Sequence, residues 1–131
     1  MDNQKIAERY FNPMFGSRAT IREAMDYAYA VAVAVGKPTF AKKAVHIVHN
    51  TFLAKVALGP SDDLITPDPK YPVRESMKEA LLEGYQLAQK TNSAPHVITA
   101  MHVMLNSLAR HVYPPIEKES YDDMVWMVIK D

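Results

Sequence analysis

The sequence predicts an all-α protein, a compact bundle of five to six helices. Apolar residues recur at helical spacing, and glycine and proline divide the 131-residue chain into segments of helical length. The stretch from Ala28 to Val35 alternates as a strand does, and its valines favour a strand locally. We still predict a helix there, because a helix cap precedes it and no second strand is present to pair with it.

Start and stop residues define the elements in order. Thr20 and Glu23 form a capping box, Gly36 and Pro38 end the helix that follows, and Thr39 caps the next one. The predicted helical segments are 2–11, 21–35, 39–58, 73–90, 94–112 and a short apolar segment at 124–129. A proline-rich loop over about 60–72 separates the third helix from the fourth. We find no internal repeat and expect one α-helical domain over 1–131.

Composition excludes several classes of protein. Lys and Arg number 15 and Asp and Glu number 15, so a globally basic nucleic-acid binder is excluded. The absence of cysteine excludes disulfide frameworks, cysteine-ligated zinc and thiol nucleophiles. No signal-peptide pattern is present, and the longest apolar run, 27–35, is much shorter than the roughly 20 residues of a membrane span. We therefore expect a cytoplasmic protein that makes no membrane contact.

The zero net charge conceals a segregated layout. Residues 27–61 and 84–116 contain no acidic side chain, and they contain all five histidines. Acidic residues outnumber basic ones in 62–83 and in 117–131. An anionic ligand is therefore most compatible with the two acid-free segments.

Helical geometry places polar groups of these segments on two faces, spanning about 120° and 140°. The face of the 39–58 helix holds Lys42, Lys43, His46, His49 and Asn50. The face of the 94–112 helix holds His96, Thr99, His102, Asn106, Ser107 and Arg110. Donors without a competing carboxylate suit a phosphate, a nucleotide or a nucleic acid. The alternative is that both faces are solvated or pair with Glu75, Glu79 and Glu83.

Other kinds of site find less support in the sequence. His46 and His49 at i, i+3 could share a metal ion with a third histidine, but no carboxylate stands beside them to orient either ring. Glu75, Glu79 and Glu83 form a carboxylate ridge, but a magnesium site of this kind needs paired acids on a second helix, which the sequence lacks. The segment around Gly36 resembles a helix-turn-helix only loosely, because Pro38 and Lys42 do not fit that pattern. No nucleotide-binding or nucleophile motif is present, so we assign no metal, no cofactor and no catalytic residue.

Two elements are more apolar than a small surface helix needs to be, namely the stretch 27–35 and the segment 124–129. Either the first is the central helix and the second its lid, or one of them is a subunit interface. Interface candidates are Tyr29, Val33, Trp126 and Met127. We predict a small non-enzymatic helical protein that acts through protein contacts, as a homo-oligomer and with a protein partner. The alternative is a binder of an anionic ligand, through the two basic faces.

Overall fold

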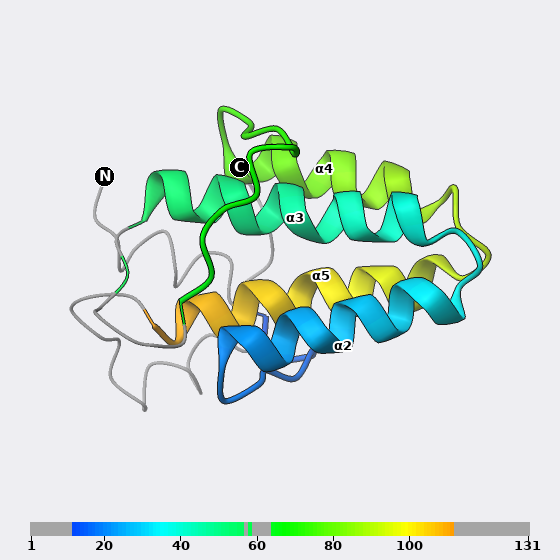
Figure 1. The fold of residues 1–131 in the computed structure, drawn as a ribbon, viewed down its shortest axis with the longest axis horizontal. Coiled ribbons are helices and arrows are strands. Elements are labelled where there is room, and N and C mark those ends of the chain that lie inside the picture. Colours follow the sequence, from blue (N-terminus) through cyan, green and yellow to red (C-terminus); the bar gives the residue numbers. More distant parts are fainter. Residues whose placement is uncertain (1–11, 57, 59–63, 112–131) are drawn as a thin grey trace.

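A computed structural model describes residues 12–56, 58 and 64–111, and this part of the chain forms four α-helices and no β-strand. The helices are α2 (Ile21–Ala34), α3 (Pro38–Lys55), α4 (Met77–Ala88) and α5 (Ala94–Ala109). Successive helices run antiparallel and form an up-and-down bundle (Figure 1). The all-α class is confirmed. The expected five to six helices are not matched, because only four form here and segments 2–11 and 124–129 lie outside the described residues.

Local capping chemistry sets where the helices begin. The Thr20 hydroxyl accepts a hydrogen bond from the Glu23 amide at 3.0 Å, so the predicted cap of α2 is confirmed. The Ser76 hydroxyl does the same for Glu79 at 3.1 Å and starts α4 at Met77, later than the predicted 73. Helix α3 begins at Pro38, so the predicted Thr39 cap is wrong: Thr39 lies inside the helix, Lys37 is the N-cap residue, and proline fits the first helical turn. Gly36 ends α2 with a φ of 79°, a left-handed conformation that favours glycine.

The two central helices are α3 and α5. Every residue from 44 to 52 and from 100 to 109 is buried, and α3 contacts all three other helices. By contrast, α2 buries Ala28, Val31 and Ala32 while Val33 on its outer side is 73% exposed. Of the two alternatives for 27–35, the one that makes it the central helix is therefore not supported, because α2 lies at the edge of the bundle.

The bundle consists of two copies of one unit, which corrects the sequence-based finding of no repeat. Unit 1 (residues 12–55) and unit 2 (residues 68–111) correspond at an offset of 56 positions, as His46 does to His102. The identical pairs are Pro13/Pro69, Arg18/Arg74, Glu23/Glu79, Ala24/Ala80, Tyr29/Tyr85, Ala32/Ala88, Ala44/Ala100, His46/His102 and Asn50/Asn106. The correspondence was missed because most matched core positions keep only apolar character, and the identities are scattered along the chain.

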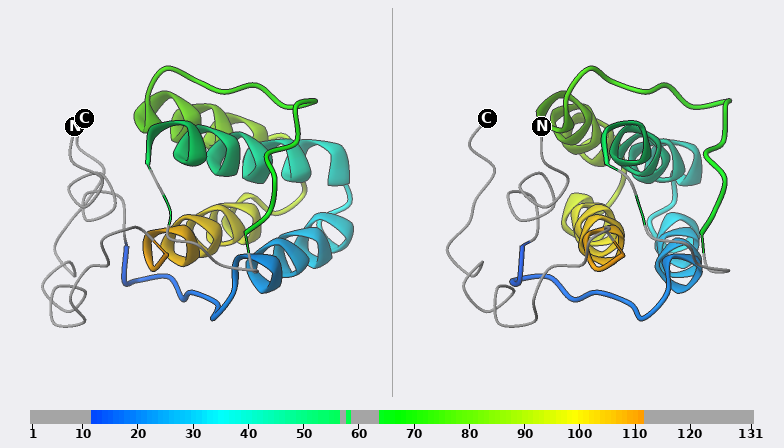
Figure 2. Two further views of the ribbon diagram at one scale, coloured as in Figure 1. Left: turned by 60° about the vertical axis from the view of Figure 1, so that its left-hand side comes forward. Right: turned by 90° about the vertical axis from the view of Figure 1, so that its left-hand side faces the viewer.

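Each unit contributes an extended strap followed by a helical hairpin. Strap 1 is residues 12–20 and strap 2 is residues 68–76. Strap 1 runs past α5 to reach α2, and strap 2 runs outside α3 to reach α4 (Figure 2). Each strap therefore lies on the second helix of the other unit, so the two units complete each other.

None of the helices in the described ranges is long and apolar enough to cross a membrane.

Candidate functional site

The structure divides the predicted anion-binding face of α3. Lys42 and Lys43 are partly exposed, whereas His46, His49 and Asn50 are at most 5% exposed. The predicted face of α5 is divided in the same way. His96 and Arg110 are exposed, Thr99 is partly exposed, and His102, Asn106 and Ser107 are buried.

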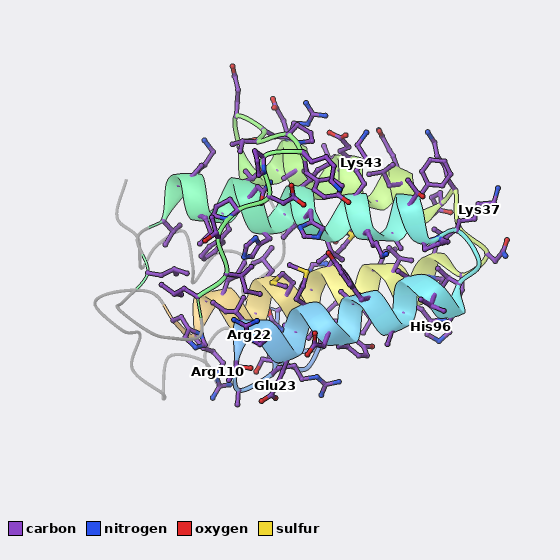
Figure 3. All side chains as sticks on the ribbon, viewed as in Figure 1. Arg22, Glu23, Lys37, Lys43, His96 and Arg110 are labelled. Carbon is purple, nitrogen blue, oxygen red and sulfur yellow. The ribbon has the colours of Figure 1, made fainter. Side chains whose placement is uncertain are left out.

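The predicted residues also spread along the bundle. His96 and Arg110 lie at opposite ends of α5, and Lys43 lies on the α4 side of α3 (Figure 3). A helix rises 1.5 Å per residue, so about 21 Å separate the ends of the α5 face. The residues of the two predicted faces therefore do not form one pocket, and their binding of an anion stays a prediction.

Two of the buried histidines have matching environments. The Tyr29 hydroxyl lies 2.6 Å from His46 Nε2, and the Tyr71 ring stacks on His46 with centroids 4.4 Å apart. In the other half, the Tyr85 hydroxyl lies 2.6 Å from His102 Nε2, and the ring of Phe15 stacks on it at 4.5 Å. Each histidine thus joins its own hairpin to the strap of the other unit.

Two buried asparagines hold the straps. Asn106 Nδ2 lies within hydrogen-bonding distance of the carbonyls of Asn12, Phe15 and Gly16, and its Oδ1 accepts from the Asn12 amide at 2.9 Å. Asn50 Nδ2 donates to two carbonyls of strap 2, those of Asp68 and Tyr71. These predicted ligand donors therefore bind the chain itself.

The next residue on each central helix completes the attachment. The Thr51 hydroxyl accepts from the Arg74 amide at 3.1 Å. The equivalent Ser107 hydroxyl accepts from the Arg18 amide at 2.9 Å. Both straps are therefore held by the same pair of helix positions, a buried amide followed by a hydroxyl.

His49 differs from the other buried histidines because neither ring nitrogen has a hydrogen-bond partner. Burial lowers the pKa of His49 to about 4, an effect opposed by the neighbouring Asn50 side chain, and burial lowers that of His102 to about 4. Both rings are therefore neutral at pH 7. Across the residues placed by the structure, no three histidine, aspartate or glutamate side chains gather to hold a metal ion.

Lys43 lines an open groove between α3 and α4, with a volume of about 360 Å³. Glu79, Glu83 and Lys90 line the same groove. Glu83 pairs with Arg74 through both carboxylate oxygens, and this hydrogen bonding lowers the pKa of Glu83. Opposite charges share this groove, which supports the alternative that Lys43 serves to balance the acidic helix.

A second surface joins the α2–α3 hairpin to strap 2. We call it the basic–aromatic patch and define it by Tyr29, Lys42, Lys70 and Tyr71. Lys42 Nζ lies 4.9 Å from the centroid of the Tyr29 ring, and Lys70 Nζ lies 5.7 Å from that of Tyr71. Sequence reasoning found Lys42 but missed strap 2, because it treated 60–72 only as a loop. Comparison of the two units at the offset of 56 would have indicated it.

The outer face of α2 is the second candidate surface. Val33 is 73% exposed, Tyr29 is 38% exposed, and Ala30 and Ala34 are also exposed. Two of the predicted interface residues therefore lie on one open helix face. The other two, Trp126 and Met127, lie outside the described residues.

The alternative helix-turn-helix is not supported by the geometry. Figure 1 shows α2 and α3 lying side by side and antiparallel, whereas the helices of that motif cross at about 90–120°. Glu75 precedes α4, so the predicted glutamate ridge is shorter than expected.

No protein-family model, no curated protein sequence and no solved structure matches this chain.

Proposed function

We propose that this chain is a small, non-enzymatic helical binding protein that associates with a second copy of itself through the outer face of α2. The difference between the two units at equivalent positions carries this proposal. Unit 1 has Ala30, Val33 and Ala34 on the outer face of its first helix. Unit 2 has Gln86, Gln89 and Lys90 at the same places.

Comparing the outer faces of α2 and α4 shows which residues the fold requires and which apolar residues are particular to α2. Both helices bury the same positions against the bundle, as Ala32 and Ala88 show with no exposed surface. A polar surface at these three positions is therefore compatible with the unit, although Leu82, one turn earlier on α4, is 49% exposed where α2 has Asp26. Exposed apolar surface of this kind is typical of a protein contact.

A second copy is the partner that the charges favour. Residues 27–36 carry no charge, and Asp26 lies one turn before Ala30, so the surfaces formed by Ala30, Val33 and Ala34 can meet without burying a charge or opposing like charges. The net charge of zero removes long-range repulsion between copies. Small side chains at 30 and 34 allow the two helix backbones to approach closely.

Sedimentation equilibrium of the full chain tests this proposal. Val33→Gln places the residue of unit 2 on the α2 face and should weaken dimerisation at least tenfold without changing the fold. The matched control is Gln89→Ala, which alters the equivalent exposed position of α4 and should leave dimerisation unchanged. A wild-type chain that stays monomeric at about 0.5 mM would contradict the proposal, since specific dimers associate well below that concentration. An equal effect of both variants would contradict it too.

A further inference from the structure

We infer that the basic–aromatic patch binds a nucleotide unit, namely a phosphate together with its planar base, either free or within a single strand. This inference goes beyond self-association, because it concerns the strap 2 side of the α2–α3 hairpin and a different class of ligand. It is carried by the arrangement of two tyrosine rings and two ammonium groups, and by a comparison with unit 2.

The two tyrosines are held by one buried side chain. The Tyr29 hydroxyl bonds His46 Nε2 at 2.6 Å, and the Tyr71 ring lies parallel to the His46 ring, with an interplanar angle of 2°. His46 is only 5% exposed, whereas Tyr29 and Tyr71 reach the surface. The aromatic rings are therefore positioned before any ligand arrives.

Both ammonium groups lie above these rings. Lys42 extends from α3 over Tyr29, and Lys70 extends from strap 2 near Tyr71. Single-stranded nucleic acids are bound in this way elsewhere, by aromatic rings that stack on bases and cations that contact the backbone. A base stacking on Tyr29 would displace the Lys42 ammonium from the ring towards the adjoining phosphate.

The charged groups around His46 leave the patch with a net positive charge. Lys42 and Lys70 face it together with one carboxylate, that of Asp68, whose Oδ1 accepts a hydrogen bond from the Lys70 amide. Burial lowers the pKa of His46, and Asp68 opposes this effect. The ring is neutral at pH 7, so the two lysines supply the positive charge.

The equivalent surface, formed by the α4–α5 hairpin and strap 1, shows that the fold does not need these lysines. It retains the aromatic framework as Tyr85, His102 and Phe15. However, Ile98 replaces Lys42 and Met14 replaces Lys70, and Met14 is 83% exposed. The two lysines are thus present on only one of the two equivalent surfaces, as expected for a ligand site rather than a structural requirement.

Fluorescence anisotropy with the full chain tests the inference. The probes are a labelled ten-nucleotide DNA single strand, the same sequence as a duplex, a labelled mononucleotide, and unlabelled inorganic phosphate as a competitor. The test variant is Lys42→Ile/Lys70→Met, which introduces the residues of the equivalent surface, Ile98 and Met14. We expect at least tenfold weaker single-strand binding and a decrease of about 1.4 in the slope of log affinity against log salt, as for two lost phosphate contacts.

The matched control is Lys37→Ser/Lys43→Thr. It removes the same charge and also introduces the residues of unit 2, Ser93 and Thr99, but it lies outside the patch. Circular dichroism should show an unchanged fold for both double variants. The mononucleotide arm distinguishes a free nucleotide from a longer strand as the natural source.

Three results would overturn the inference. The first is an absence of binding to both the single strand and the mononucleotide. The second is an equal loss in the two double variants, which would indicate net charge alone. The third is binding that does not depend on base stacking, seen either as a preference for the duplex or as competition by phosphate as strong as that by unlabelled mononucleotide. Tyr29 borders both surfaces, but Val33→Gln alters no residue of the patch and Lys42→Ile/Lys70→Met alters no residue of α2, so failure of self-association is measured separately.

Discussion

One buried histidine is present in the core of only one of the two units. Position 49 is a histidine in unit 1, and the equivalent position 105 in unit 2 is a leucine. Leu105 is fully buried and His49 is 1% exposed, so both occupy the core. A neutral imidazole carries one N–H donor and one acceptor, and both are unpartnered at His49. The unbonded His49 ring therefore lowers the stability of unit 1, and Leu105 avoids this loss in unit 2.

We predict that His49→Leu stabilises the protein by about 1–2 kcal/mol at pH 7, because burying an unbonded polar group is unfavourable. The gain should grow as the pH falls. The unfolded chain takes up a proton at His49 near pH 6.5, whereas the folded chain does so only near pH 4. Wild-type stability therefore decreases between these values by up to about 3 kcal/mol through this group.

Urea denaturation from pH 7.5 to 4.5 checks this prediction. His102, whose pKa is also lowered, is present in both the wild type and the His49→Leu variant. Its contribution therefore cancels in the difference between their free energies of unfolding. The reciprocal change Leu105→His should destabilise the protein. A variant that is less stable than the wild type at pH 5 would show that the imidazole has a partner.

At the scale of the helices, the two hairpins have different pairs of side chains at one equivalent packing position. Gly84 on α4 lies against Met101 on α5, and a Cβ at position 84 would approach the terminal Met101 carbon at 2.2 Å. The equivalent residues of unit 1 are Ala28 and Val45. The smaller Gly84 is thus paired with the larger Met101, and the larger Ala28 with the smaller Val45.

We predict that Gly84→Ala destabilises the protein by up to about 2 kcal/mol, because the added methyl group overpacks the contact with the fully buried Met101 by more than the roughly 1 kcal/mol that alanine gains over glycine in a helix. Adding Met101→Val should recover at least half of this loss, since the pair then matches Ala28 and Val45. A double-mutant cycle by urea denaturation measures the coupling between the two sites. Additive effects would show that Gly84 and Met101 do not determine the fit.

For the whole molecule, the exchange of straps determines how the two units depend on each other. Strap 1 belongs to unit 1 but is held by Asn106 of unit 2. Strap 2 belongs to unit 2 but is held by Asn50 of unit 1. The straps also cover the polar residues of the central helices. Neither hairpin can bury its second helix without the other unit, so we expect one cooperative unfolding transition.

We predict that Asn106→Ala destabilises the protein by about 2–4 kcal/mol, because it leaves strap carbonyls without a donor. Asn50→Ala should have a smaller effect, since Asn50 donates to two carbonyls and its Oδ1 has no partner. Hydrogen exchange should show reduced protection in α2 as well as α5 for Asn106→Ala. Loss of protection limited to α5 would mean that the units unfold independently.

The positions of the helices could largely be predicted from the sequence, but the burial of their polar side chains could not. Thr20 and Gly36 set the ends of α2, since caps and breakers act over a few residues. His46, His49 and Asn50 were assigned to a surface face because they share one side of α3. Helical periodicity shows which residues share a side, yet it does not show whether a strap covers that side.

The sequence by itself determined the all-α class, the four described helices to within a few residues and the apolar character of α2, because these depend on local capping and spacing. Only the tertiary structure decided which helices are central and which polar groups are buried. It also decided that residues 56 positions apart have equivalent environments. These features depend on contacts between segments distant in the chain, such as strap 1 with Asn106 and Tyr71 with His46.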